Sequence, residues 1–252
     1  MILTTVDVKP NNVFLDYEAG APQSEGLVVK LSDIEDAAYV PVDSAIIGRQ
    51  VGNQMWRSPE ATCAGPVQKP TDMFSFGLVC IYAMKKVIPL FVDETTLDAE
   101  LEPLAVVIER QISYFGDPEG YAGLMDWVDG RFVLREAYIL TCEDLGKPDT
   151  PLRPFAKAVD VDQPFKDFIA SIMSLDPRRR LTAREALAHE WFDEVRHIEA
   201  RPGAAAETKE MFAQSQVDEP RPKSNNLELA PDTKRGESDE DVPEAQDVGS
   251  KT

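Results

Sequence analysis

Apolar residues recur along the first 198 positions of this 252-residue chain, and the first pattern that they form is typical of two short strands. The apolar runs at residues 13–15 and 27–31 flank a segment that contains Gly20, Pro22 and Gly26. Short apolar runs separated by Gly and Pro are typical of strands that are joined by a turn. The pattern therefore predicts a β-hairpin.

Farther along the chain the apolar spacing indicates helices. Residues 33–60 show little periodicity and predict a long loop, whereas later segments repeat apolar residues at helical intervals. Thr182 and Glu185 have the spacing of a capping box, which marks the start of a helix. We expect helices over residues 73–84, 104–114, 163–174 and 182–188.

The composition changes near the end of the chain. From about residue 203 onward the sequence is rich in Pro, Ser, Ala, Glu and Asp and has scarcely an aromatic residue. Such a segment cannot bury enough apolar surface to order itself. We therefore expect a folded domain over residues 1–198 and a disordered acidic tail over residues 199–252. The acidic run at residues 237–241 fits a solvated stretch, with a docking or phosphorylation site as the alternative.

Charge and cysteine content exclude several classes of partner. The formal net charge is −19, which argues against nucleic acid and anionic membranes as partners because both require a positive surface. The cysteines at positions 63, 80 and 142 lie far apart, which favours reduced thiols over a disulfide framework. No signal peptide or membrane-spanning run is visible. We expect an intracellular protein, cytoplasmic or nuclear, and no feature indicates an oligomeric state.

One short loop near the start combines three chemically useful side chains. Asp7, Lys9 and Asn12 supply an acid, an ammonium group and a carboxamide, and Pro10 bends the loop. Phosphoryl transfer needs an acceptor for a hydroxyl proton, a cation and a magnesium ligand, because the protein mainly positions reactants and neutralises charge. These side chains can supply all three. Taken alone, the loop also fits a surface turn with a capping Asp and a Pro-fixed bend.

From Asp7 onward this loop resembles the catalytic loop of eukaryotic-type protein kinases, in which the same spacing separates Asp and Asn. The resemblance implies that Asp7 and Lys9 are catalytic and that Lys9 and Asn12 contact the nucleotide. Lys9 makes the loop more similar to serine/threonine kinases than to tyrosine kinases. The implied cofactors are ATP and Mg²⁺, and the implied partner is a protein substrate.

A second metal ligand is implied after the predicted hairpin. Asp33, Ile34 and Glu35 stand where kinases carry Asp-Phe-Gly, so the resemblance implies that Asp33 holds Mg²⁺ together with Asn12. From the residues alone, Asp33 also fits the end of a strand. Glu35 departs from the family pattern because it replaces a glycine, which restricts the backbone and adds negative charge.

Three further residues are implied to be structural. Glu60 lies in a Ser-Pro-Glu run that resembles the Ala-Pro-Glu of kinases, and Arg180 lies in a late Asp-Pro-Arg-Arg-Arg run. The resemblance implies that these two side chains form a buried ion pair. Asp72 resembles the Asp that caps a central helix and braces the catalytic loop, and its residue type alone fits a helix N-cap.

The resemblance covers residues 7–192 and implies only part of a kinase. The expected fold is mainly α with a short β-hairpin, the larger C-terminal lobe of the kinase-like fold. The Gly-rich loop, strand Lys and helix Glu that precede the catalytic loop in kinases do not occur in this sequence. At Asn53 the family usually has a Thr bonded to the catalytic Asp, so an Asn there requires altered geometry. Ser44 is a candidate acceptor in the activation segment.

We interpret the chain as a catalytic-domain fragment of a serine/threonine kinase, which in its complete form transfers the ATP γ-phosphate to protein hydroxyls. Glu35 and the missing lobe favour an alternative, a catalytically inactive pseudokinase-like binding module. A truncated gene product is a further hypothesis. A fragment that does not fold is the last, because the apolar faces at 73–84 and 163–174 would lack their covering helices.

Overall fold

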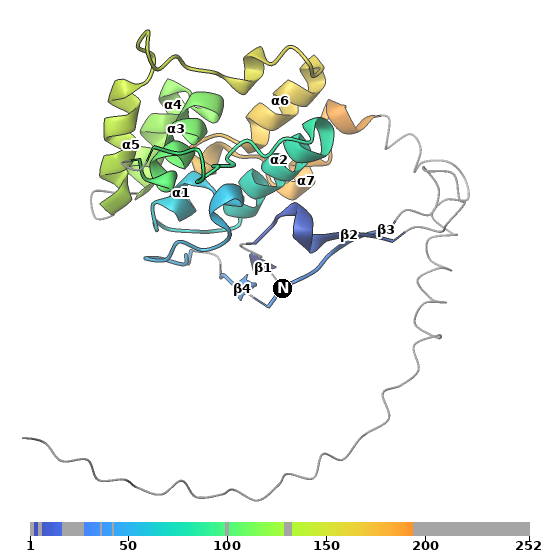
Figure 1. Cartoon of the computed structure of the whole chain (residues 1–252). Helices are drawn as coiled ribbons and strands as arrows, with labels where there is room; N and C mark the ends of the chain where they lie inside the picture. The colour runs from blue at the N-terminus through green and yellow to red at the C-terminus, as the bar shows by residue number, and fades with distance from the viewer. Residues whose placement is uncertain are drawn as a thin grey trace, which may run out of the picture. The chain divides into compact units, whose positions relative to one another are not determined.

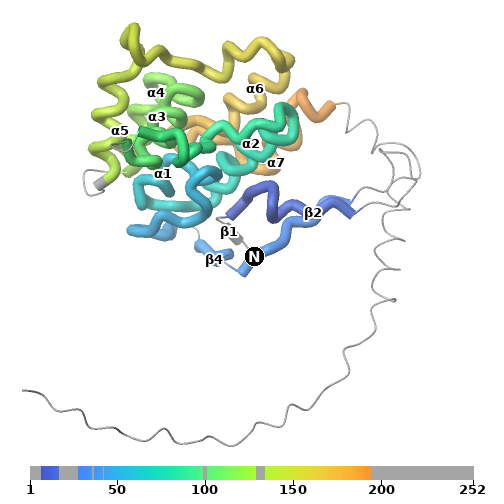
Figure 2. Tube along the Cα trace, viewed as in Figure 1, coloured from blue at the N-terminus to red at the C-terminus, as the bar shows by residue number. Residues whose placement is uncertain are grey.

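A computed structural model describes seven segments of the chain, and all structural statements concern them: residues 3–4, 7–16, 28–35, 37–41, 43–98, 101–128 and 133–193. Contacts divide the chain into a unit of residues 1–208 and a unit of residues 209–252. The first unit holds every described residue (Figures 1 and 2). The tail expected at 199–252 lies outside the described residues.

Two pairs of short antiparallel strands occur near the N-terminus. Strand β2 (Val13–Asp16) pairs with β3 (Val28–Leu31), with Val13 opposite Leu31. This pairing confirms the predicted hairpin, although the residues that connect the strands lie outside the described part. Strand β1 (Leu3–Thr4) pairs with β4 (Ala38–Tyr39), which falls within the segment expected to be a loop.

Helices make up most of the described unit, and Figure 1 labels them in chain order. Three expected helices are confirmed as α2, α3 and α6, while the fourth is shorter than expected and forms α7. Thr182 and Glu185 do form the capping box before α7. None of the described helices is long and apolar enough to cross a lipid bilayer. The helices are α1 (Pro59–Thr62), α2 (Pro70–Lys85), α3 (Pro103–Phe115), α4 (Pro118–Val128), α5 (Val133–Asp144), α6 (Gln163–Ile172) and α7 (Ala183–Ala186). Single 3-10 turns are η1 (Pro10–Asn12), η2 (Gln54–Trp56), η3 (Phe155–Lys157), η4 (Pro177–Arg179) and η5 (Glu190–Phe192).

Helix α4 was missed at the sequence level because glycine weakens a helical pattern. Its Gly123 packs directly against the loop before η4, where a Cβ atom would lie 2.2 Å from Asp176 Oδ2. Asp176 Oδ1 in turn accepts a hydrogen bond from the Arg178 backbone N–H and so caps η4. The glycine is therefore a requirement of close packing. Helix α5 was also missed.

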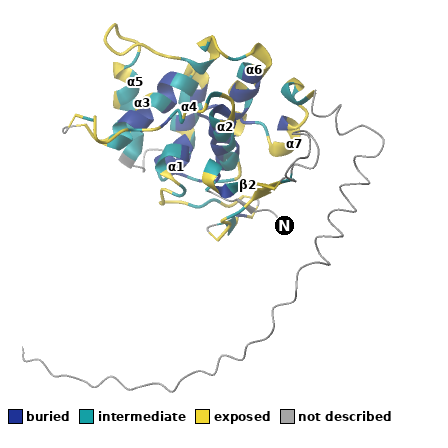
Figure 3. Ribbon diagram, turned by 45° about the vertical axis from the view of Figure 1, so that its right-hand side comes forward, coloured by how far each residue is buried: buried dark blue, intermediate teal, exposed yellow. Residues whose placement is uncertain are grey.

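The core divides into two apolar clusters. The larger joins α2, α6 and η5, and in it Phe168 stacks on Trp191 with ring centroids 4.7 Å apart. The smaller joins α3, α4 and α5 around Tyr138. Most apolar side chains of α2 and α6 are thus buried or packed against this cluster. The expected exposure of parts of these faces occurs at the end of α2, where Met84 is 52% exposed. Further exposed apolar side chains lie on the hairpin (Figure 3): Phe14, Leu15, Val29 and Leu31 are 45% to 61% exposed.

Glu60 and Arg180, which were expected to pair, form a buried two-point ion pair. Both N···O distances are 2.7 Å, and the side chains are 1% and 0% exposed. The other guanidinium hydrogens bond to the backbone carbonyls of Ser174, Leu175 and Pro70. Since a guanidinium has five N–H groups, all of its donors are used. Such saturation offsets the desolvation of the two charges.

The two arginines that precede Arg180 fix helix α4. Arg178 pairs with Asp126 on α4 and donates to the Gly123 carbonyl, and Arg179 pairs with Asp117 just before the helix. Burial alone would raise the pKa of Asp117, but hydrogen bonds from the Gly120 amide and Arg179 lower it overall. The run of three arginines therefore holds α4 and α1 around the same turn.

Truncation of Arg180 is expected to destabilise the fold strongly. Arg180→Ala leaves the Glu60 carboxylate buried without its partner, so the free energy of unfolding should fall by about 3 to 5 kcal/mol. Urea titration followed by tryptophan fluorescence measures this loss.

Arg179→Ala is the matched control, because its ion pair is exposed and should contribute less than about 1 kcal/mol. If Arg180→Ala yields no folded protein, Arg180→Lys provides a second test, since a lysine cannot make the two-point contact. A loss below about 1 kcal/mol for either Arg180 variant would contradict the structural role of the pair.

Thiol reactivity should separate the three cysteines. Cys63 and Cys80 are buried, and burial raises the pKa of each thiol to about 12 from the ordinary value of 9.0. The thiolate is the reactive form, so at pH 8 only the partly exposed Cys142 should react quickly with a disulfide reagent. The pKa values are raised in the folded state, so stability should be complete below pH 9 and fall between pH 9 and 12. Three fast thiols in the native protein would contradict this assignment.

Candidate active site

The loop of residues 7–12 gathers the three side chains that sequence analysis selected. Lys9 Nζ lies 2.6 Å from Asp7 Oδ2. Asn12 Nδ2 donates to the backbone carbonyl of Asp7 at 3.0 Å and to Asp7 Oδ2 at 3.1 Å. An acid, an ammonium group and a carboxamide therefore meet at a single carboxylate.

Local sequence explains why the loop closes on itself. Pro10 occupies the first position of the 3-10 turn η1, where its missing N–H costs no hydrogen bond. The Asn12 N–H donates to the Lys9 carbonyl, and the Val13 N–H donates to the Pro10 carbonyl before β2 begins. Val8 is buried and anchors the loop on the domain. The turn thus leads directly into the hairpin.

Asp33 follows the other strand of the same hairpin. The Ser32 N–H donates to the backbone carbonyl of Asn12 at 2.8 Å, and the Ser32 hydroxyl donates to the same oxygen at 3.3 Å. Asp33 is the next residue, is exposed, and takes a left-handed backbone conformation with φ of 54°. Asp tolerates this conformation better than most residues. The hairpin therefore places Asp33 one residue beyond its hydrogen-bonded junction with Asn12.

A segment far along the chain reaches the same carboxylate through its backbone. The Asn53 N–H donates to Asp7 Oδ1 at 3.3 Å. The Asn53 side chain instead accepts a hydrogen bond from the Met55 N–H and caps η2. The altered geometry expected at this position is therefore a main-chain contact. Asn is a common capping residue directly before a turn, and this preference is the sequence signal that could have indicated the cap of η2.

Arg57 and Gln111 hold this segment in place, and sequence analysis missed both. Arg57 donates to the carbonyls of Val51 and Gly52, and Gln111 on α3 donates to the Arg57 carbonyl. Burial lowers the pKa of the Arg57 guanidinium. The Gln111 contact joins residues that lie far apart in the sequence, so no local sequence pattern indicates it.

Asp72 lies in the first turn of α2 and is not its N-cap. The helix begins at Pro70, and Lys69 holds the N-cap position. The prediction of an N-cap was therefore wrong by one turn, although a carboxylate in the first turn still favours the helix macrodipole. Two hydrogen bonds link α2 to the segment before it: the Ser75 hydroxyl donates to the Trp56 carbonyl, and the Ser58 hydroxyl bonds to the Thr71 hydroxyl.

A groove of about 430 Å³ lies beside the cluster. Its lining includes Asn53, Phe91, Asp93, Glu94 and Val107. Because Asn53 also contacts Asp7, the groove extends close to this carboxylate.

The site offers oxygen ligands, which suit a hard cation such as Mg²⁺ that is also bound by phosphate oxygens. Within the described ranges, no group of three or more His, Cys, Asp or Glu side chains is arranged to hold a metal ion. Asn12 has an amide oxygen, and its nitrogen is already bound to Asp7. Asp33 adds an exposed carboxylate. Mg²⁺ is commonly held by one or two protein oxygens together with phosphate oxygens.

Comparison with known proteins identifies a matching family and similar sequences. A family model described as the protein kinase domain matches residues 3–192. The human dual specificity protein kinase CLK1 is 29% identical over 215 residues, which cover 76% of this chain and 40% of that protein. The rabbit calcium/calmodulin-dependent protein kinase type II subunit delta is 27% identical over 185 residues, 73% of this chain and 26% of that protein.

The chain therefore spans less than half the length of either relative. The family match, however, covers most of the chain and includes Asp7, Asn12, Asp33, Glu60 and Arg180. On this basis the chain belongs to the protein kinase family.

Proposed function

We propose that this chain carries the phosphoryl-transfer site of a serine/threonine protein kinase. The observation that carries the proposal is the Asp7 carboxylate, which receives hydrogen bonds from Lys9, Asn12 and the Asn53 backbone. A fixed carboxylate beside a cation is the arrangement that phosphoryl transfer requires, because positioning and charge neutralisation supply most of the catalysis.

Asp7 is the proposed acceptor of the substrate proton. Lys9 and Asn12 hold its Oδ2 atom at 2.6 and 3.1 Å, while Oδ1 has a longer hydrogen bond of 3.3 Å from Asn53. We assign Oδ1 to the substrate hydroxyl, because it faces the segment that borders the groove beside Asn53. Asp7 orients that hydroxyl and removes its proton as the oxygen attacks phosphorus.

The proposed cofactors are ATP and Mg²⁺. Asn12 and Asp33 are the proposed magnesium ligands, and Lys9 is the proposed partner of the γ-phosphate. The bound ion would neutralise phosphate charge in the transition state. The fixed Asn12 amide and the exposed Asp33 carboxylate support this assignment, because both residues lie at the same end of the hairpin, where Ser32 bonds to the Asn12 carbonyl.

A protein hydroxyl is the proposed acceptor, and Ser or Thr the proposed residue type, on the basis of Lys9. The proposed location is inside the cell, in the cytoplasm or nucleus, where the free thiols of Cys63 and Cys80 remain reduced. We expect no nucleic acid partner and no membrane partner.

A catalytically inactive binding module is the second candidate. It is favoured by the hairpin beside Asp7, which exposes apolar side chains on both faces, including Phe14, Leu15 and Val29. Exposed apolar surface of this kind suits a binding partner. Glu35 at the glycine position favours the same candidate.

Asp7→Asn should remove most phosphate transfer by the full chain. The amide keeps the shape of the side chain but cannot accept the substrate proton, so turnover should fall by about 10²-fold or more. Transfer of radiolabelled γ-phosphate to a mixture of unstructured protein substrates measures the effect.

Asp16→Asn is the matched control, since Asp16 is an exposed acid on the same hairpin and should leave turnover unchanged. Equal activity of the Asp7→Asn protein would refute the role of Asp7. A folded wild-type chain without transfer would refute autonomous activity and favour the binding module.

Acid hydrolysis of the labelled products should release phosphoserine and phosphothreonine. Lys9 supports this outcome, whereas the name of the human relative describes that protein as a dual specificity kinase. Phosphotyrosine as a main product would contradict the serine/threonine assignment while leaving the role of Asp7 intact.

A further inference from the structure

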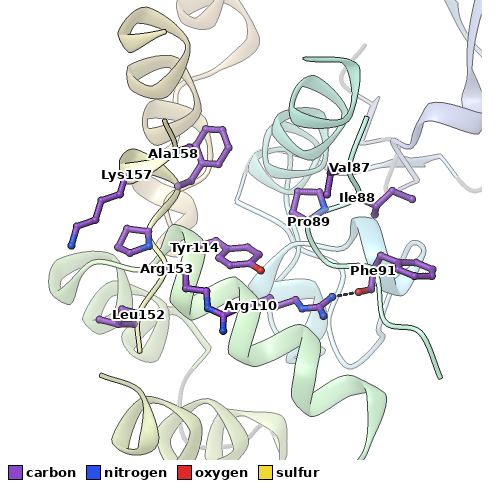
Figure 4. A pocket seen from close by; sticks show the side chains of 12 residues that line it. Val87, Ile88, Pro89, Phe91, Arg110, Tyr114, Leu152, Arg153, Lys157 and Ala158 are labelled. Atoms are coloured by element: carbon purple, nitrogen blue, oxygen red, sulfur yellow. Dashed lines mark hydrogen bonds between the residues drawn. The ribbon is translucent and has the colours of Figure 1, made fainter. Parts of the chain in front are cut away.

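A second groove, of about 590 Å³, lies across helix α3 (Figure 4). Residues 87–91, which follow α2, form one bank, and residues 152–158 form the other. Arg110 and Tyr114 of α3 lie between them, with the Tyr114 ring facing into the space. We call this feature the α3 groove. Its volume falls in the range of typical ligand sites.

Large apolar side chains are exposed on both banks of the α3 groove. Val87, Phe91 and Leu152 are each 48% to 54% exposed, although they are large side chains on one contiguous surface. Single exposed apolar residues are common, but a group of them around one hollow marks a binding surface. The lining therefore indicates a ligand with an apolar side chain.

The charge of the α3 groove is opposite to that of the chain. Its charged lining residues are Arg110, Arg153 and Lys157, and among the residues that the structure describes no Asp or Glu lines it. The whole chain has 45 acidic residues against 26 basic ones. A cationic hollow on such a chain attracts acidic ligands and repels basic ones, because complementary charge steers association and selects partners.

Hydrogen bonds fix both banks of the groove to α3. The Arg110 guanidinium donates to the Phe91 carbonyl on one side. On the other side the Arg153 backbone N–H donates to the Ser113 hydroxyl at 2.8 Å. A groove held in this way needs little reordering to bind a ligand, which favours affinity.

Backbone chemistry decides how a peptide would be recognised. Pro89 and Pro154 line opposite banks and have no N–H group to donate. Recognition by added strand pairing is therefore disfavoured at these positions. The ligand would be held by its side chains, one apolar group in the hollow and carboxylates at the rim.

We infer that the α3 groove is a docking site for an extended segment of another protein, in which an apolar residue is flanked by Asp and Glu. Phe91 also lines the groove beside Asn53, so a docked protein would be held next to the Asp7 cluster. The inference concerns binding alone and holds whether or not the chain transfers phosphate.

The test measures the binding of fluorescent nonapeptides to the full-length chain. Each nonapeptide has a central Leu or Phe. One set has Asp, Glu, Ser and Gly at the flanking positions, and the other has Lys, Arg, Ser and Gly. Fluorescence anisotropy should show the acid-flanked set binding at least about tenfold more tightly than the base-flanked set. Replacing the central residue by Ser should weaken binding to a similar degree.

The double variant Arg153→Glu and Lys157→Glu should lose binding of the acid-flanked set. Lys69→Glu with Arg184→Glu is the matched control, because these exposed residues lie outside the groove and change the net charge equally. Thermal unfolding of all three proteins verifies that the variants are folded.

Four results would overturn the inference: equal or tighter binding of base-flanked peptides, equal loss in the control variant, no peptide binding tighter than about 1 mM, or occupation by a second copy of the chain. Sedimentation velocity detects the last case as a dimer that the double variant abolishes.

Discussion

The rest of the structure depends on the ion pair and the hydrogen bonds of the buried Arg180 guanidinium. It joins Glu60 on α1 to Pro70 at the start of α2 and to the carbonyls of residues 174 and 175. Helix α1 directly follows the segment that contains Asn53, and the Asn53 backbone contacts Asp7. This charged group in the core thus acts together with Arg57 and Gln111 to hold the chain beside the candidate active site.

The same interaction carries a physical cost that explains its geometry. The attraction between two charges that are removed from water offsets their desolvation cost only when their hydrogen bonds are complete. Arg180 meets this condition with five donors used, and its guanidinium lies 5.0 Å from the centre of the Phe74 ring. The exposed pairs of Arg178 and Arg179 are weaker individually, yet they place α4 around the same turn.

Sequence predicted the parts of the fold that local pattern determines. Regular apolar spacing located the hairpin, α2, α3 and α6, and residue type selected Asp7, Lys9 and Asn12, which the structure brings together. Helix α4 escaped notice because Gly123 is needed by packing against Asp176, a contact between distant residues. The Asn53 contact and the α3 groove were equally hidden, since each combines segments that only the folded chain places side by side.

Calorimetric binding of ATP to the full chain, with and without Mg²⁺, tests the central claim that the hairpin end holds a nucleotide. The account predicts saturable binding that requires Mg²⁺ and that Asp33→Asn weakens at least about tenfold, because a charged ligand is lost. Asp43→Asn should bind normally, since Asp43 is also exposed and left-handed but lies outside the site. No binding by the folded chain, or equal binding by the Asp33→Asn protein, would contradict the account.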